Sequence, residues 1–131
     1  MTLAARLEEY IKSELSDSAL YAELAKKAPS SNYRKILMEM AADDTSHANE
    51  FKRIYKSMTG RNYNPIVKPP ALKGSFNEIL RSRIPSESDD YRKYCEEYIT
   101  SKGNSVLKTT FYLAGIDDNV HALHLIYMLM K

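Results

Sequence analysis

Two segments of the sequence place an aspartate three residues before a histidine. Asp44 and His47 form the first pair, and Asp118 and His121 form the second. Residues three apart share one face of an α-helix, so the two side chains of each pair can bind one ligand together. Carboxylate and imidazole groups are both common metal ligands. The two pairs therefore indicate a metal site.

A second motif, Glu-x-x-Asp-x-x-x-Tyr, also occurs twice. It comprises Glu14, Asp17 and Tyr21, and it recurs 73 residues later as Glu87, Asp90 and Tyr94. The Asp-x-x-His pairs recur with an offset of 74 residues. Two motifs with nearly the same offset indicate that the halves of the chain are related by an approximate two-fold repeat.

Four stretches have the periodicity of amphipathic helices, with apolar residues every three or four positions. We expect helices over about 2–27 and 31–58, a third from Phe76 to Gly103, and a fourth over about 105–130. Short loops within each half predict two antiparallel hairpins.

The expected fold is all-α: an antiparallel four-helix bundle in a single domain over 1–131. Hairpin 1 covers about 2–58 and hairpin 2 about 76–130, joined by a long crossover over about 59–75 that is rich in Pro and Gly. Pro85 interrupts the helical pattern of the third helix, where we expect a kink or a short break.

The candidate ligands occupy positions where core residues belong. In the second and third helices the inward stripes are Tyr33, Leu37, Met40, Asp44, His47, Phe51, Ile54 and Met58, and Phe76, Leu80, Ile84, Glu87, Tyr91, Tyr94 and Tyr98. Buried carboxylates cost several kcal/mol unless their charge is compensated, and the stripes contain no Lys or Arg. Two divalent cations balance four carboxylates, and this ligand set suits Fe or Mn.

The bulk composition is that of a soluble globular protein, and it excludes several classes of partner. The formal net charge of +2 is too small to indicate nucleic acid binding, and no apolar run is long enough to cross a membrane. The single cysteine, Cys95, excludes an internal disulfide, and the N-terminus lacks the apolar core of a signal peptide. We therefore expect a cytoplasmic protein.

The stretches 14–29 and 41–48 resemble the first hairpin of the rubrerythrin-like branch of the ferritin-like superfamily. The resemblance covers nearly the whole chain. It implies two Fe ions, with Mn or an Fe/Mn pair as the variant, that act on hydrogen peroxide or O2. By motif position the implied metal ligands are Glu14, Asp44, His47, Glu87, Asp118 and His121. Additional ligands or hydrogen-bonding neighbours are Asp17, Tyr21, Asp90 and Tyr94.

The sequence departs from the family pattern at two points. The family's motif is normally Glu-x-x-His, whereas Asp44 and Asp118 are one methylene shorter and reach less far toward a second ion. The sequence also lacks the four cysteines of the rubredoxin module that rubrerythrins proper carry, so we expect electrons to come from an external donor. We expect a homodimer. The alternative function is a structural or interaction bundle whose metal site is degenerate or purely structural. Asp43 and Asp117 are interpreted as solvated or as hydrogen-bonding neighbours of the ligands, His124 as peripheral, and Cys95 as an ordinary half-buried thiol.

Overall fold

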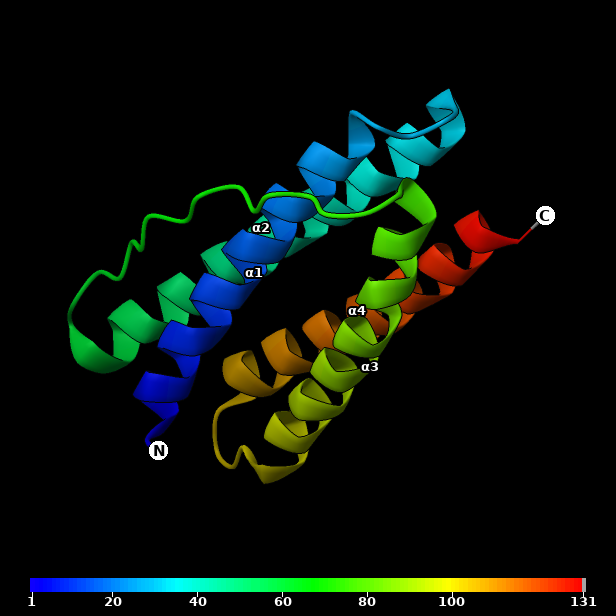
Figure 1. The fold of residues 1–131 in the computed structure, drawn as a ribbon. Coiled ribbons are helices and arrows are strands. Elements are labelled where there is room, and N and C mark those ends of the chain that lie inside the picture. Colours follow the sequence, from blue (N-terminus) through cyan, green and yellow to red (C-terminus); the bar gives the residue numbers. More distant parts are fainter. Residues whose placement is uncertain (131) are drawn as a thin grey trace. The chain divides into compact units, whose positions relative to one another are not determined.

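The protein is described from a computed structural model, which places residues 1–130 (Figure 1). The chain forms four helices: α1 (Leu3–Ala25), α2 (Ser31–Thr59), α3 (Phe76–Thr100) and α4 (Ser105–Leu129). No strand occurs within residues 1–130. The chain divides into two compact units. The first comprises residues 1–72, and the second begins at Lys73. The predicted all-α class is confirmed, and each unit contains one helical hairpin.

Local signals fix the ends of α1 and α2. The Thr2 side chain accepts a hydrogen bond from the Ala5 N–H at 3.1 Å, and the Ser30 side chain accepts one from the Tyr33 N–H at 3.2 Å. These N-caps satisfy backbone donors that lack a partner in the first helical turn. Gly60 ends α2 with a φ of 74°, a left-handed conformation that glycine adopts without steric cost.

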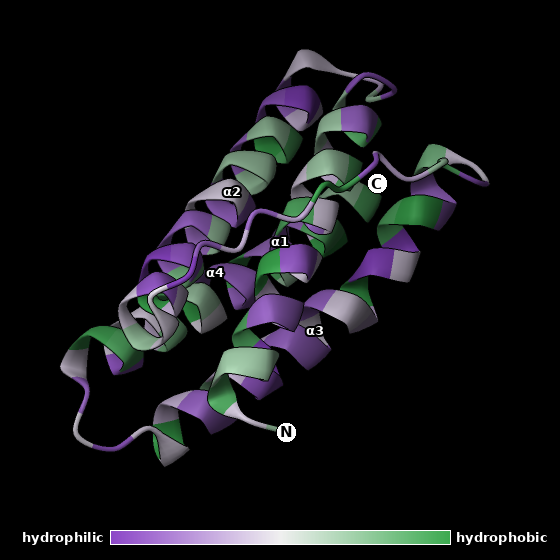
Figure 2. Cartoon of the chain, turned by 90° about the vertical axis from the view of Figure 1, so that its left-hand side faces the viewer, coloured by the Kyte–Doolittle hydropathy of each residue, from purple (hydrophilic) through white to green (hydrophobic). Residues whose placement is uncertain are grey.

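The core of the α1–α2 hairpin follows the predicted stripe of the second helix from Leu37 to Ile54, but Met58 at its end is 45% exposed. In α1 the buried face differs in part from the expected one, because Ile11 and Leu24 are buried without having been predicted as inward. Leu7, Ile11, Leu24, Leu37 and Phe51 are fully buried. Figure 2 shows hydrophobic and hydrophilic residues alternating along the helices, as expected for amphipathic helices. The hairpin therefore holds its inward positions in a packed apolar setting, where a polar side chain needs compensation.

The α3–α4 hairpin begins with a capping box. Ser75 accepts a hydrogen bond from the Glu78 N–H at 3.1 Å, and the Glu78 side chain returns to the Ser75 N–H. Pro85 lies inside α3, which continues as one helix from Phe76 to Thr100, so the expected short break does not occur.

The inward stripe of α3 differs from the prediction near its end. Tyr91 and Tyr98 are 38% and 39% exposed, whereas Glu97 is buried. After Tyr94, either a three-residue or a four-residue step returns to roughly the same helix face, and the three-residue step is the one that is buried. The predicted inward positions of α4, from Leu107 to Met128, are all buried.

The segment between α2 and α3 contains neither helix nor strand, as predicted for the crossover. Its start is fastened to the first hairpin: the Tyr55 hydroxyl donates to Glu8 at 2.7 Å, and Arg61 donates to the Tyr55 hydroxyl at 3.2 Å. The Tyr63 ring lies 5.8 Å from the ring of Tyr55. None of the four helices carries an apolar stretch that would let it cross a membrane.

Candidate metal centre

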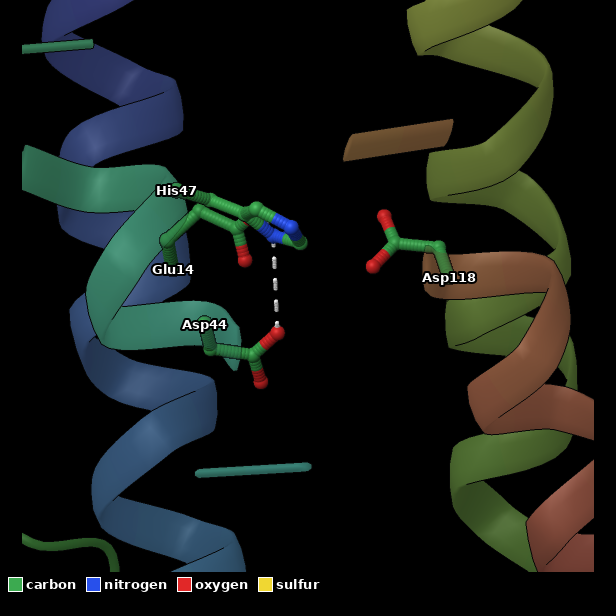
Figure 3. A group of neighbouring side chains, drawn as sticks. All are labelled: Glu14, Asp44, His47 and Asp118. Carbon is green, nitrogen blue, oxygen red and sulfur yellow. Dashed lines mark hydrogen bonds and ion pairs between the residues drawn. The ribbon is translucent and has the colours of Figure 1, made fainter. Parts of the chain in front are cut away.

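The first hairpin gathers three predicted ligands. Glu14 projects from α1, and Asp44 and His47 project from α2 one turn apart; all three are buried. The Nδ1 atom of His47 lies 3.0 Å from Oε1 of Glu14 and 3.9 Å from Oδ1 of Asp44. Figure 3 shows the polar ends of these three side chains turned toward one another.

The second hairpin contains an equivalent arrangement of one glutamate, one aspartate and one histidine. Glu87 on α3 and Asp118 and His121 on α4 are each 1% exposed. The Nδ1 atom of His121 lies 3.7 Å from Oε1 of Glu87 and 3.8 Å from Oδ1 of Asp118. In both hairpins, therefore, the same imidazole nitrogen faces one glutamate and one aspartate.

These separations fit a shared metal ion. Ligand atoms bound about 2.1 Å from one ion lie roughly 3–4 Å from each other at ordinary coordination angles. The distances from each histidine Nδ1 atom to its glutamate and aspartate oxygens fall between 3.0 and 3.9 Å. The Nδ1 atom is the nitrogen placed for coordination in both histidines, because it faces both carboxylates.

The charge of each set also fits a divalent cation. Glu14 and Asp44 together carry −2 when ionised, and so do Glu87 and Asp118. A protonated histidine leaves each buried set with −1, whereas one divalent ion beside a neutral histidine leaves it neutral. Oxygen-rich ligands with one imidazole and no thiolate suit Fe or Mn.

The additional residues proposed from the motif divide into two groups. In the α3–α4 hairpin, Asp90 is half-buried and offers an oxygen within 4.8 Å of ligand atoms of Glu87 and Asp118. Asp17 is buried, but within residues 1–130 it belongs to no such group. Asp90 is thus the better placed of the two for a metal.

Tyr21 and Tyr94 are both buried, at 0% and 2% exposure. The Tyr94 ring stacks on Phe111 with a centroid separation of 6.0 Å. Burial agrees with a place near the carboxylates, and hydrogen bonding from these phenols to the carboxylates stays a prediction.

Ser18 is a supporting residue whose part the sequence did not reveal. Its hydroxyl donates to the Ala41 carbonyl at 2.8 Å and lies 2.8 Å from the Thr45 hydroxyl. These contacts join α1 to α2 one turn from Glu14 and Asp44, so they hold the two ligand-bearing helices in register. The only sequence signal is that Ser18 follows Glu14 by one turn, at a position of the first helix where an apolar residue is the default.

The second hairpin has different residues at the positions equivalent to Ser18 and Ala41. The repeat offsets carry Ser18 to Tyr91 and Ala41 to Gly115. A Cβ atom added at Gly115 would lie 3.6 Å from Cδ1 of Tyr91 and 3.5 Å from Cβ of Tyr94. In the first hairpin a serine faces an alanine and the helices are joined by hydrogen bonds. In the second hairpin a tyrosine faces a glycine, and the helices are joined by van der Waals packing of the tyrosine side chain.

Two helical hairpins, each burying a glutamate beside an Asp-x-x-His pair, define the class of protein as a ferritin-like helical bundle of the carboxylate–histidine type. The solved structure of a hypothetical protein from Pyrococcus furiosus has the same fold, with a TM-score of 0.83 and 16% sequence identity. The match covers 98% of this chain and 89% of that one.

Sequence comparison identifies the family. The sequence pattern described as Rubrerythrin matches residues 6–73, which include the first hairpin's three candidate ligands. An uncharacterised protein of Bacillus subtilis (strain 168), YhjR, is 30% identical over 132 residues, covering 98% of this chain and 88% of that protein. The chain belongs to the rubrerythrin family.

Proposed function

We propose that this protein is a non-haem diiron oxidoreductase of the rubrerythrin type, with Fe/Mn as the alternative metal pair, that reduces hydrogen peroxide or O2. The observation that carries the proposal is the repeated set of buried ligands. In each hairpin the Nδ1 atom of one histidine lies within 4 Å of a glutamate oxygen and of an aspartate oxygen. Such sets match the chemistry of the rubrerythrin family, to which the chain belongs.

The ligand residues hold one ion per hairpin in this proposal. Glu14, Asp44 and His47 form one set, and Glu87, Asp118 and His121 form the other. When bound, two Fe(II) ions supply the two electrons that convert one H2O2, with two protons, into two water molecules. An external donor in the cytoplasm then restores the electrons.

The remaining contribution of the chain is positioning and exclusion of water. Tyr21, Phe51 and Phe111 are fully buried on the helices that carry the ligands. A ring contact between Tyr10 and Phe51, with centroids 5.9 Å apart, closes the α1–α2 core. A dry site strengthens the interaction between carboxylates and a cation, and it limits release of reactive oxygen species.

Peroxide consumption by Fe(II)-loaded protein tests the proposal. We expect anaerobic addition of H2O2 to oxidise two Fe(II) per peroxide consumed, without the hydroxyl radicals that free Fe(II) generates. A His47→Ala/His121→Ala double variant should lose this activity while its circular dichroism stays helical. The matched control is His124→Ala, which alters a half-buried histidine outside the ligand sets.

The competing function is a structural or interaction bundle. Its specific support is the shorter Asp side chain in both pairs, at Asp44 and Asp118. A protein that binds Fe or Mn tightly but consumes neither peroxide nor O2 above the double-variant rate would favour that function and contradict ours.

A further inference from the structure

The first hairpin carries a line of aromatic side chains that leads away from its ligand set. Phe51 follows His47 by one turn of α2, and Tyr55 follows Phe51 by one more turn on the same face. Phe51 and Tyr55 are 0% and 3% exposed. Tyr63 is half-buried in the crossover, and its ring lies 5.8 Å from the ring of Tyr55. The line therefore runs from the ligand-bearing turn, over about 12 Å of helix between His47 and Tyr55, to the surface of the same hairpin.

The second hairpin shows that the fold does not require this aromatic line. By the repeat offsets, the residues equivalent to Glu8, Phe51 and Tyr55 are Arg81, Leu125 and Leu129. Leu125 is fully buried, so an aliphatic side chain fills the equivalent position in the core of the α3–α4 hairpin. A helical hairpin of this kind thus packs without a phenol at the position of Tyr55 and without a carboxylate at that of Glu8.

Tyr55 has the hydrogen bonds of a redox-active phenol. Its hydroxyl donates to Oε2 of Glu8 at 2.7 Å, a distance typical of a charge-assisted bond, and Arg61 donates to the phenolic oxygen at 3.2 Å. A phenol gives up an electron more readily when its proton can pass to a base, because the product is then a neutral radical. Glu8 is that base. Arg61 occupies a lone pair of the oxygen and leaves the O–H to point at Glu8.

A cavity opens beside the outer end of the aromatic line. Its volume is about 240 Å³, and it is lined by Met1, Ala5, Glu8, Glu9, Lys12 and Tyr63. This volume is slightly below the range of about 300–1,000 Å³ usual for ligand sites, so it suits a molecule about one ring in size. The Tyr63 ring offers a stacking surface, and the two carboxylates accept hydrogen bonds from hydroxyl groups. These features fit a small hydroquinone.

We propose that Tyr55 and Tyr63 relay electrons from a small hydroquinone in this cavity to the candidate metal site. The relay rests on the proposed function, because peroxide is its oxidant, and it names the class of the external donor. Peroxide that arrives before the two Fe(II) electrons are restored takes one electron and one proton from each tyrosine. One H2O2 and two phenols thus give two water molecules and two neutral phenoxyl radicals, with Glu8 receiving the Tyr55 proton. One hydroquinone then returns two electrons and two protons and leaves as the quinone.

One-electron oxidation of the metal-free full chain tests the relay apart from the peroxide chemistry. The sequence contains ten tyrosines and no tryptophan, so azide radicals made by pulse radiolysis oxidise mainly tyrosine. We expect the radical to settle on Tyr55, because Glu8 takes its proton. The electron paramagnetic resonance signal of freeze-quenched wild type should be lost in Tyr55→Phe and in Glu8→Gln. The matched control is Tyr33→Phe, which removes a half-buried phenol of the same helix and should keep the signal.

Turnover with a donor tests the cavity. Iron-loaded wild type should form one quinone per H2O2 when 1,4-hydroquinone is supplied. Tyr55→Phe should lose quinone formation while it stays helical and keeps its metal content. A radical signal that persists in Tyr55→Phe would overturn the proposal, and so would equal quinone formation in wild type and Tyr55→Phe. A wild type without peroxide activity, but with the Tyr55 radical intact in the metal-free chain, would contradict the proposed function and still support Tyr55 as a redox-active residue.

Discussion

The Nδ1 atom of His47 lies 3.0 Å from Oε1 of Glu14, within hydrogen-bonding distance. The equivalent atoms of His121 and Glu87 are 3.7 Å apart, beyond that distance. The two hairpins thus present the same three ligand atoms, but the first holds its histidine closer to its glutamate. Local repetition of the ligand set, and not one isolated motif, is what supports a site for two ions.

Removing one histidine should remove one ion. His47→Ala should leave the set of Glu87, Asp118 and His121 intact, and His121→Ala should leave that of the first hairpin. Each variant is expected to lose about one of two bound ions or to bind it at least 10–100-fold more weakly. Isothermal titration with Mn(II) measures both quantities, and unchanged binding in either variant would contradict the ligand assignment.

Replacing a buried carboxylate should strengthen the metal-free fold and weaken metal binding. Asp44 is 1% exposed and lies with Glu14 around one histidine. Asp44→Asn keeps the shape and removes a buried charge, so we expect the free energy of unfolding without metal to rise by about 1 kcal/mol. Urea unfolding with and without Mn(II) measures both effects, and Asp89→Asn on the exposed side of α3 is the control. A less stable metal-free Asn variant would show that the carboxylate is not a burden on the fold.

The contact between Gly115 and α3 leaves room for one methyl group. A Cβ there would meet its nearest neighbours at 3.5–3.8 Å, which is ordinary van der Waals distance, and Gly115 is interior to α4. Gly115→Ala should therefore stabilise the protein by about 0.5–1 kcal/mol through helix propensity. Gly115→Leu should destabilise it, because the larger side chain meets Tyr91 and Tyr94. Thermal unfolding of both variants measures these two stability changes. A destabilised Gly115→Ala variant would mean that α3 and α4 approach each other more closely than the 3.5 Å separation from the added Cβ indicates.

The hydrogen bond from Tyr55 to Glu8, near the start of the crossover, should weaken at alkaline pH. The hydrogen bond to Glu8 is the main reason that the pKa of Tyr55 is raised above 10.0. A raised pKa in the folded state contributes stability below pH 10 that is lost as pH rises through the folded-state pKa. The stability difference between wild type and Tyr55→Phe should therefore shrink as pH increases above about 10. Denaturant unfolding at pH 8 and at pH 10.5 measures it, and a difference that grows with pH would contradict the assignment.

Much of the fold follows from the sequence because its helices are long and strongly periodic. The four helices, the crossover and the buried positions of Glu14, Asp44 and His121 were predicted, and the structure agrees. The periodicity of one helix does not reveal which polar residues of separate helices belong together. The internal repeat does, because both motifs recur with nearly the same offset.

The details that escaped prediction depend on packing between helices. Burial of Glu97 in place of Tyr98 reflects a choice between two steps that a 3.6-residue period allows equally. The support from Ser18, and its replacement by Tyr91 against Gly115, depends on which helix faces approach closely. The exposed apolar residues of α4 were not singled out, because together with those of the inner face they erase the usual amphipathic pattern.

The most direct test of the central claim is a count of metal ions bound at equilibrium by protein purified without chelator. Metal analysis after anaerobic loading with Fe(II), and separately with Mn(II), should give two ions per chain. The His47→Ala/His121→Ala double variant should retain none. Only trace metal in the folded wild type, or equal metal in the double variant, would contradict the account.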